Sequence, residues 1–503
     1  MRSKRLRGYL VVATLFAGTV SASARGNTDE DTDDKATPDK VAQAAQPDPA
    51  QPDQATPQGT PAPTTGPSTG TEQSAQTPGA REPDEQLRKL IDEQVAKGLK
   101  PKGPYIEFSG YARAAVGLAI RGGRQVCFGL PGADTKWRLG NECDYVIEPQ
   151  FTGRLVTLAD KSSWGIVVMP GLYRTFEDPN GDDKTFFSNL PAEFRQLYFF
   201  GENIPQLLNG RVWGGRRYYD RLHLDINDQF LEIDDSDGAG IEDMQLGFGK
   251  LSVAFLMNPN SEANGVPIVG GGTVSSANIA PFRLTARLTD IKTAPEGSLQ
   301  VWAAFYGTST SEDQAEEATI DKPDNRFRFG VYHTLGKVLG GSNFVGAKLE
   351  YGTNRLLWRA VVQEQIVVND GHTSVDVIGE FRSTRERADE DSEWATNNWG
   401  SLGGRVDTQI QGPFRFSVEA GWDRVFPETG DAPQLIKATG CLSINAGEQA
   451  GSRPTFRLFY THGFWNDAAK GLYAAGAGGQ RLAQVYGDKN NGGSFGIQAE
   501  AWW

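Results

Sequence analysis

Apolar and polar residues alternate with a period of two along most of the chain after Phe108. The alternation is clearest at residues 327–332, 414–420 and 455–461, in runs separated by clusters of Gly, Asn, Asp and Pro. This pattern predicts β-strands whose two faces meet different surroundings. With roughly 20 residues for each strand and its turn, the segment would hold about 16 to 20 strands.

The end of the chain favours a transmembrane barrel over a β-sandwich or a propeller, which would share this texture. In residues 495–503 one face is apolar and the other is mostly polar. The apolar face holds Phe495, Ile497, Ala499, Ala501 and Trp503, and the polar face holds Gly496, Gln498, Glu500 and Trp502. We interpret these as a lipid face and a lumen face, ending on an aromatic residue at the membrane interface.

The beginning of the β-rich segment shows the same division. Glu107, Ser109, Tyr111 and Arg113 share one face, and Phe108, Gly110, Ala112 and Ala114 share the other. We therefore expect the first and last strands to pair and to close an all-β antiparallel barrel over residues 105–503.

Residues 1–24 carry the features of a secretory signal peptide. A basic start is followed by the apolar run from Tyr9 to Val20 and by the small residues Ala22-Ser23-Ala24, which predicts cleavage before Arg25. A single membrane anchor is the alternative, but the run is short for one, and the rest of the sequence holds no stretch of about 18 apolar residues. The chain is thus expected in the outer membrane of a Gram-negative bacterium, with membrane lipid around its barrel.

Two further segments precede the barrel. Residues 25–83 are rich in Pro, Gln, Thr, Ala and Asp, a composition typical of a disordered linker. Residues 84–100 place Leu87, Ile91, Val95 and Leu99 at intervals of four, which predicts a short helix in the periplasm. It could be an isolated amphipathic helix or one strand of a trimeric coiled coil, and residues 25–100 could bind a periplasmic partner or peptidoglycan.

Charge and composition exclude several classes of partner. The formal net charge is -13, and removal of four signal-peptide cations (Arg2, Lys4, Arg5 and Arg7) brings it to about -17. No basic stripe offsets this balance, so we expect no nucleic-acid partner. The four histidines show no metal-ligand spacing, and we predict neither a metal site nor a cofactor.

The cysteines predict one disulfide. Cys127 and Cys143 lie 16 residues apart with a Pro-Gly pair between them, so a bond would close a rigid loop. Two free thiols are the alternative reading. Cys441 lies in a strand-like run and is expected to be a small buried residue.

The β-rich segment resembles the maltoporin family of sugar channels. The resemblance extends from Phe108 to Trp503 and is weakest between about 255 and 440. It is carried by GYAR at 110–113, CF at 127–128, PGA at 131–133, RLGNEC at 138–143, AEFR at 192–195, WGGRRYYDR at 213–221, GAGIE at 238–242, GFGKLS at 247–252, SRP at 452–454, NGGSF at 491–495 and WW at 502–503. It implies a homotrimer of 18-stranded barrels that passes maltose and malto-oligosaccharides.

In that family a row of aromatic side chains contacts the apolar faces of successive glucosyl units, and charged groups hydrogen-bond the hydroxyls. Matching positions imply aromatic contacts at Tyr111, Phe344 and Trp502, and one near Phe186 or Phe187 that reaches a neighbouring subunit. Ordinary aromatics of the membrane interface are the alternative for each. The polar track is implied at Arg113, Arg138, Glu148, Arg195, Arg221, His223, Asp225, Asp228 and Phe230, the last at the narrowest point.

Parity supports one part of this assignment. Arg221, His223 and Asp225 alternate with Leu222, Leu224 and Ile226, so the charged face would meet sugar while the apolar face packs on the wall. A salt-bridged surface strand would show the same alternation.

Several positions depart from the family pattern. Val146 stands where the family has a tyrosine of the aromatic row, and Gly451 where it has a tryptophan. Phe230 replaces a tyrosine, and His223 and Asp225 are interchanged. With the N-terminal extension, which is similar to that of the sucrose porin branch, these departures keep open a sucrose-type or general sugar porin.

The sequence bears on two other classes of function. An outer-membrane hydrolase would need a nucleophile motif, and we find none, so we expect no enzymatic activity. An envelope tether or adhesin acting through residues 25–100 is the remoter alternative.

Overall fold

The structure, a computed structural model, describes residues 104–175, 192–257, 281–308, 325–387, 392–475 and 480–503, and nearly all of its elements are strands. The strands that form the main sheet are β1 (Tyr105–Ala119), β2 (Asp144–Thr157), β3 (Ser163–Thr175), β4 (Ala192–Ile204), β5 (Gly210–Arg217), β8 (Ser236–Gln245), β9 (Lys250–Met257), β10 (Pro281–Ala294), β11 (Gly297–Thr308), β12 (Arg326–Val338), β13 (Gly341–Gly352), β14 (Arg355–Val368), β15 (Thr373–Glu386), β16 (Ala395–Gln411), β17 (Phe414–Pro427), β18 (Gln434–Asn445), β19 (Thr455–Trp465) and β20 (Asn491–Trp502). The remaining elements are a hairpin of β6 (Leu222–Leu224) and β7 (Gln229–Glu232), the short helix η2 (Pro205–Leu207), and the helices α3 (Asp467–Ala474) and α4 (Gln480–Tyr486).

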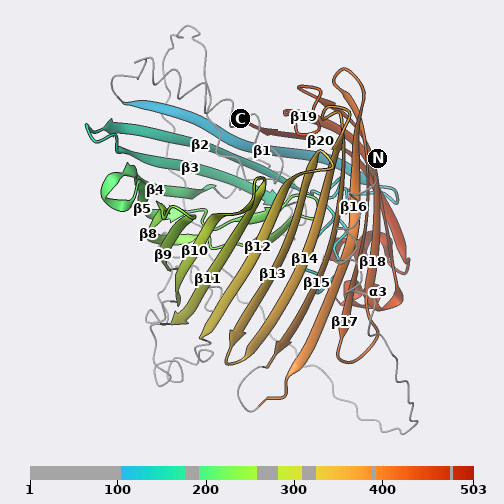
Figure 1. Ribbon diagram of the computed structural model, residues 1–503. Coiled ribbons are helices and arrows are strands. Elements are labelled where there is room, and N and C mark those ends of the chain that lie inside the picture. The colour runs from blue at the N-terminus through green and yellow to red at the C-terminus, as the bar shows by residue number, and fades with distance from the viewer. Residues whose placement is uncertain (1–103, 176–191, 258–280, 309–324, 388–391, 476–479) are drawn as a thin grey trace, which may run out of the picture. The chain divides into compact units, whose positions relative to one another are not determined.

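Among the described residues the main sheet has 18 antiparallel strands and closes on itself (Figure 1). β1 pairs with β2 on one side and with β20 on the other, and Tyr111 lies directly opposite Trp502 in this closing pair. The predicted barrel, its strand number and the pairing of its ends are confirmed. Closure leaves no strand edge without a partner, which a spanning sheet requires because lipid offers no hydrogen bonds.

The wall alternates as the sequence predicts, apolar outside and mostly polar inside. On β20, Phe495 and Ile497 are exposed on the outer face, whereas Gln498 and Glu500 are buried on the inner face. Outward aromatics lie toward both ends of the barrel: Phe108, Phe151, Trp164 and Trp503 toward one end, and Phe255, Phe282, Phe305, Phe327 and Tyr351 toward the other. An apolar belt between two aromatic girdles is the outer surface of a barrel that crosses a bilayer. Among the described residues, no helix is long and apolar enough to span a membrane.

Most strand connections are short at one end of the barrel, and the longest connections lie at the other end. Connections 295–296, 339–340 and 412–413 are tight turns, while residues 120–143 and 466–490 form long loops at the opposite end. In barrels of this kind the short turns face the periplasm and the long loops face outward.

Two long connections fold into the barrel and pack on its inner wall. We call residues 120–143 the first inner loop and residues 218–235, which contain β6 and β7, the second inner loop. Their apolar side chains share one buried cluster with the wall, made of Trp137, Leu224, Ile226, Leu231, Trp302, Tyr332, Phe344, Val361 and Ile378, with Leu222 beside it. The predicted packing of Leu222, Leu224 and Ile226 on the wall is confirmed.

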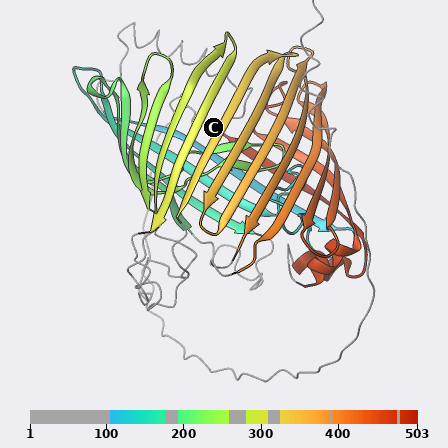
Figure 2. The ribbon, with the colours of Figure 1, turned by 60° about the horizontal axis from the view of Figure 1, so that its bottom comes forward.

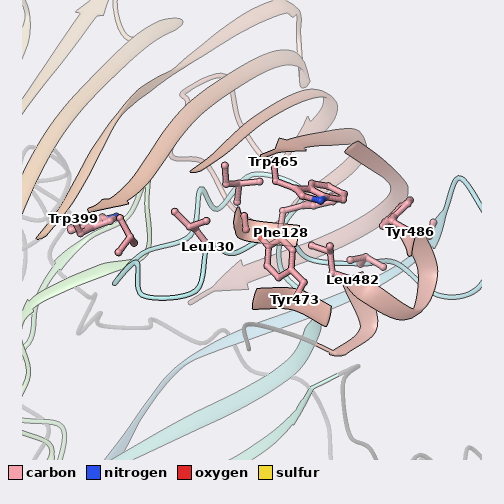
Figure 3. Packing of buried hydrophobic residues seen from close by; sticks show 12 residues of the cluster. Phe128, Leu130, Trp399, Trp465, Tyr473, Leu482 and Tyr486 are labelled. Atoms are coloured by element: carbon pink, nitrogen blue, oxygen red, sulfur yellow. The ribbon is translucent and has the colours of Figure 1, made fainter. Parts of the chain in front are cut away.

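Helices α3 and α4 cover the first inner loop at the long-loop end (Figure 2). Phe128 and Leu130 of that loop pack with Tyr473, Leu482 and Tyr486 of the helices and with Trp399 and Trp465 of the wall (Figure 3). The Tyr473 hydroxyl also donates a hydrogen bond to the carbonyl of Gly129 at 2.8 Å. This packing fixes where the first inner loop enters the barrel.

The predicted disulfide between Cys127 and Cys143 is present at the two ends of the inward part of the first inner loop. Cys441 is a buried free cysteine, also as predicted. The signal peptide (1–24), the linker (25–83) and the short helix (84–100) lie outside the described residues and stay predictions.

The outer belt can be tested by a charge placed in its middle. Ile497 is 54% exposed and lies between the outward residues Val116 and Leu458. Because a cation near the middle of a bilayer is costly, Ile497→Arg should lower the free energy of unfolding in lipid vesicles by about 2–4 kcal/mol. Guanidinium titration followed by tryptophan fluorescence measures this.

A matched control places the same residue outside the belt. Asp431 is exposed in the connection between β17 and β18, and Asp431→Arg should change the free energy of unfolding by no more than about 0.5 kcal/mol. Equal effects of the two substitutions would contradict the position of the belt.

Candidate functional site: the inner loops and the wall around Tyr111

Arg138 of the first inner loop is the centre of a charge network across the lumen. Its guanidinium donates to Glu142 at 2.6 Å, to the Tyr111 hydroxyl at 2.9 Å and to Glu500 at 2.9 Å, and it also binds Asp225. These partners belong to the same loop, to β1, to β20 and to the second inner loop. One side chain thereby joins both inner loops to the strands that close the barrel.

Glu500 is the corresponding anionic centre on the wall. Its carboxylate accepts a hydrogen bond from Tyr111 at 2.8 Å and pairs with Arg457 at 2.9 Å and with Arg453 at 3.2 Å. The residue is 3% exposed, and a buried charge of this kind is tolerable only when it is fully paired. These three partners and Arg138 supply that pairing.

The network continues along the wall to β16, β17 and β18 through the second inner loop. Asp225 lies 3.4 Å from Arg405 of β16, which binds Glu419 of β17 at 2.7 Å. Glu419 in turn pairs with Lys437 at 2.8 Å, and the Lys437 ammonium donates to the carbonyl of Leu139 in the first inner loop at 2.6 Å. These contacts therefore attach both inner loops to β16, β17 and β18 of the barrel wall.

The loop carboxylates are held in their ionised form. Burial alone would raise the pKa of Asp225, but Arg138 and Arg405 hold that pKa at about 2. Burial likewise opposes ionisation of Asp228, yet a hydrogen bond from His223 and the charge of Lys136 keep its pKa far below the ordinary range. Both groups lie outside the strands and stay negative at neutral pH, so these ion pairs persist there.

Tyr111 and Trp502 form an aromatic pair on the lumen face. They lie opposite each other on β1 and β20, and each ring is partly exposed. The Arg453 guanidinium lies 4.0 Å from the centre of the Trp502 ring, and the Tyr111 hydroxyl is fixed by Arg113, Arg138 and Glu500. The two rings thus stand among charged groups with their positions set by those groups.

A second group of polar and aromatic side chains lies around Glu148, which is paired with Tyr111 across β1 and β2. The Tyr218 hydroxyl donates to Glu148 at 2.6 Å, and Arg195 lies 3.6 Å from the same carboxylate. Arg221 stacks on Tyr218, with 3.3 Å between its guanidinium carbon and the ring centre, and binds Asp235. The His223 and Phe230 rings lie 4.3 Å apart in the same loop.

The structure therefore brings together most of the implied site residues. The network around Tyr111 contains Arg113, Arg138, Asp225 and Asp228. Asp228 is connected to it through Lys136, which pairs with Glu142 at 2.8 Å and with Asp228 at 3.3 Å. Arg113 contributes a paired contact to Asp144 at 2.9 and 2.8 Å. The second group consists of Glu148, Arg195, Arg221, His223 and Phe230.

Phe344 lies elsewhere, and the expectation that its ring is presented to a sugar needs correction. It is 2% exposed and stacks on Tyr332, with ring centres 6.1 Å apart, in the cluster that the second inner loop covers. The loop packs over this part of the wall because its apolar face needs a surface to bury against. Phe186 and Phe187 lie outside the described residues, so the predicted contact there stays a prediction.

Sequence reasoning missed several members of the network. Glu500 and Glu142 stood within the patterns already noted, and the inward parity of Glu500 was the signal that could have singled it out. Arg405, Glu419 and Lys437 gave no signal, because their roles depend on the register of β16, β17 and β18 and on where the first inner loop crosses the lumen. Tyr218 was visible only as part of the motif at 213–221.

The arrangement of rings and paired charges suits the binding of a solute. The charged groups named above are engaged in ion pairs, and within the described residues no cluster of His, Cys, Asp and Glu could hold a metal ion. Partly exposed rings beside paired charges offer an apolar surface bordered by hydrogen-bonding groups. Such a surface fits a solute that has an apolar face and a polar rim.

Removal of Arg138 should expose how much the network contributes. Arg138→Met leaves Glu142, Glu500 and Asp225 without their shared partner, so it should lower the free energy of unfolding by about 3–5 kcal/mol. It should also raise the single-channel conductance, because the inner loops lose their joint attachment. Denaturant titration and bilayer recording measure the two effects.

The matched control is Arg216→Met. Arg216 pairs with Asp237 at 2.8 Å, but both side chains are about a third exposed or more, and such pairs contribute only about 0–1 kcal/mol. If the two variants unfolded with the same midpoint, Arg138 would not have the central role described here.

Comparison with known proteins adds the family. Among solved structures, the chain is similar to OpdQ of Pseudomonas aeruginosa, with a TM-score of 0.43, 8% identity, and coverage of 80% of this chain and 99% of that chain. It is also similar to OccAB1 of Acinetobacter baumannii (0.44, 10%, 79% and 96%) and to an anion-selective porin from Comamonas acidovorans (0.40, 11%, 79% and 100%). The family model described as LamB porin matches residues 106–503. This match covers the whole barrel, so the chain belongs to the LamB porin family and is a channel-forming barrel of the outer membrane.

Proposed function

We propose that this channel mediates facilitated diffusion of maltose and malto-oligosaccharides across the outer membrane. The observation that carries the proposal is the pair of partly exposed rings, Tyr111 and Trp502, set side by side among paired charges on the lumen wall. A pyranose ring has C–H faces that lie well on an aromatic ring. Its hydroxyls form strong hydrogen bonds with charged groups such as those around Glu500 and Glu148.

The pairing of the charges supports a neutral solute. Arg138, Arg405 and Arg195 each face a carboxylate, so the lumen presents hydrogen-bonding groups without a strong field of one sign. A pore meant to concentrate one kind of ion would instead carry an excess of one charge at its constriction. Several weak sites along a wall also permit release, which conduction requires.

A sucrose-type or general sugar porin is the second candidate. Val146 and Gly451 remove two aromatic positions of the family pattern, and Phe230 lacks a tyrosine hydroxyl at the second inner loop. A wall with fewer rings would hold a long glucan less firmly than the family pattern does. This candidate uses the same barrel and differs in the dependence of affinity on chain length.

Two further features belong to the proposal. The channel would work as a homotrimer, which a mass measurement in detergent with and without boiling tests. The N-terminal extension would lie in the periplasm, where a partner or peptidoglycan could bind it. Deletion of residues 25–100 should leave conductance unchanged, whereas an envelope tether would lose its phenotype.

The test of the substrate is ion current through the purified channel in a planar bilayer, titrated with maltose, maltohexaose and sucrose. Reversible block that tightens from maltose to maltohexaose is the result expected for a malto-oligosaccharide channel. Block without dependence on glucan length would favour the sucrose-type or general porin. No block by any of the three would contradict a sugar-binding lumen.

The aromatic pair gives a sharper prediction. Trp502→Ala removes one ring from the lumen and should weaken maltohexaose binding by about 2- to 10-fold, since a ring contact contributes about 0.5–1.5 kcal/mol. Trp358→Ala removes a ring that is 44% exposed on the outer face of β14, and it should leave sugar binding unchanged. The titration of current block described above measures both.

A further inference from the structure

Tyr173 is an inward-facing aromatic with an open ring. It lies on β3 directly opposite Val146 of β2, which faces the lumen and is 7% exposed. Tyr173 itself is 38% exposed, whereas several other inward aromatics are packed away. These packed residues include Tyr198, Trp213, Tyr219, Tyr332 and Phe344, each at most 2% exposed.

The Tyr173 ring offers an apolar surface, and charged side chains surround it. The Arg195 guanidinium carbon lies 5.9 Å from the ring centre, and charged neighbours of the hydroxyl include Asp144, Lys136 and Arg113. Gly171, two residues before Tyr173, leaves the space that Arg195 occupies, because a Cβ there would collide with the arginine side chain. The position of Arg195 beside the ring is therefore built into the wall.

The register places Tyr173 near the pair formed by Tyr111 and Trp502. Trp502, Tyr111 and Glu148 form one row across β20, β1 and β2. The adjacent row runs from Glu500 through Arg113 and Val146 to Tyr173. Tyr173 is thus two strands from Tyr111, roughly 10 Å across the sheet, and one row further along the pore. The Arg195 side chain passes from β4 over Gly171 of β3 and comes within 3.6 Å of the Glu148 carboxylate, which lies opposite Tyr111.

We propose that Tyr173 is a sugar-contacting aromatic of this channel and supplies, from the neighbouring strand, the ring that Val146 lacks. The contact surface then runs from Trp502 through Tyr111 to Tyr173, with Arg195 and Glu148 as hydrogen-bonding groups at its edge. A valine at position 146 leaves the face of the Tyr173 ring clear, whereas a second ring there would compete for the same space. This inference rests on the proposed function as a sugar channel.

The test is the titration of current block by maltohexaose and by maltose in four variants. Tyr173→Ala should weaken maltohexaose binding by about 2- to 10-fold, and Tyr173→Leu, which keeps apolar bulk, should weaken it similarly. Tyr173→Phe keeps the ring and should stay within about twofold of the unmodified channel. Tyr173→Ala combined with Val146→Tyr returns a ring to this part of the wall and should recover affinity.

The matched control is Trp164→Ala, since Trp164 is also 38% exposed but lies on the outer face of the same strand. It should leave block by either sugar unchanged. A Tyr173→Leu channel that binds maltohexaose normally, while Trp502→Ala weakens binding, would overturn the role of Tyr173 alone. If the combined variant failed to recover affinity, the ring would not be the cause of the loss, and the inference would also fall. Absence of block in the unmodified channel would overturn the proposed function itself.

Discussion

Inside a bilayer no water is available to the backbone, so each strand must find hydrogen-bonding partners on both sides. The pairing of β1 with β20 satisfies this requirement for the backbone. The side chains then alternate between the two faces of the wall, and only their polarity can differ from one face to the other. Apolar residues turn outward to lipid, and polar residues are directed into a space that the inner loops partly fill. The buried charges of that space follow directly, because a closed polar interior that is narrowed by loops must pair its own charges.

The pairing determines the shape of the lumen. Arg138 and Glu500 lie where the two inner loops meet the closing strands, and their ion pairs hold both loops against the wall. The apolar faces of the loops add the cluster around Trp137 and Tyr332, and α3 and α4 cover the first inner loop from outside. What is left for a solute is the surface on which rings such as Tyr111 and Trp502 stay partly open beside charges already satisfied. A neutral molecule with an apolar face suits this surface better than an ion.

Much of this arrangement could be predicted from the sequence, because a period of two is a local property. The strand parity of residues 107–114 and 495–503 and the packing face of Leu222, Leu224 and Ile226 follow from neighbouring residues. The closure of the barrel followed from the matching faces of its two end strands, and the disulfide from two cysteines on either side of a Pro-Gly pair. Contacts set by register between distant strands could not be predicted. Phe344 was expected at the lumen surface but lies under the second inner loop, and Tyr173 was not singled out because its importance depends on standing opposite Val146.

We propose that the inner loops and their paired charges leave a path for neutral sugars. Uptake of labelled maltose and of labelled lactobionate, a disaccharide acid of similar size, into lipid vesicles that contain the channel tests this proposal. If the charges of the lumen are mutually satisfied, maltose should enter several times faster than lactobionate at equal concentration and without a membrane potential. Equal entry would contradict a preference for neutral solutes, and faster entry of the acid would require an excess of cationic groups along the pore.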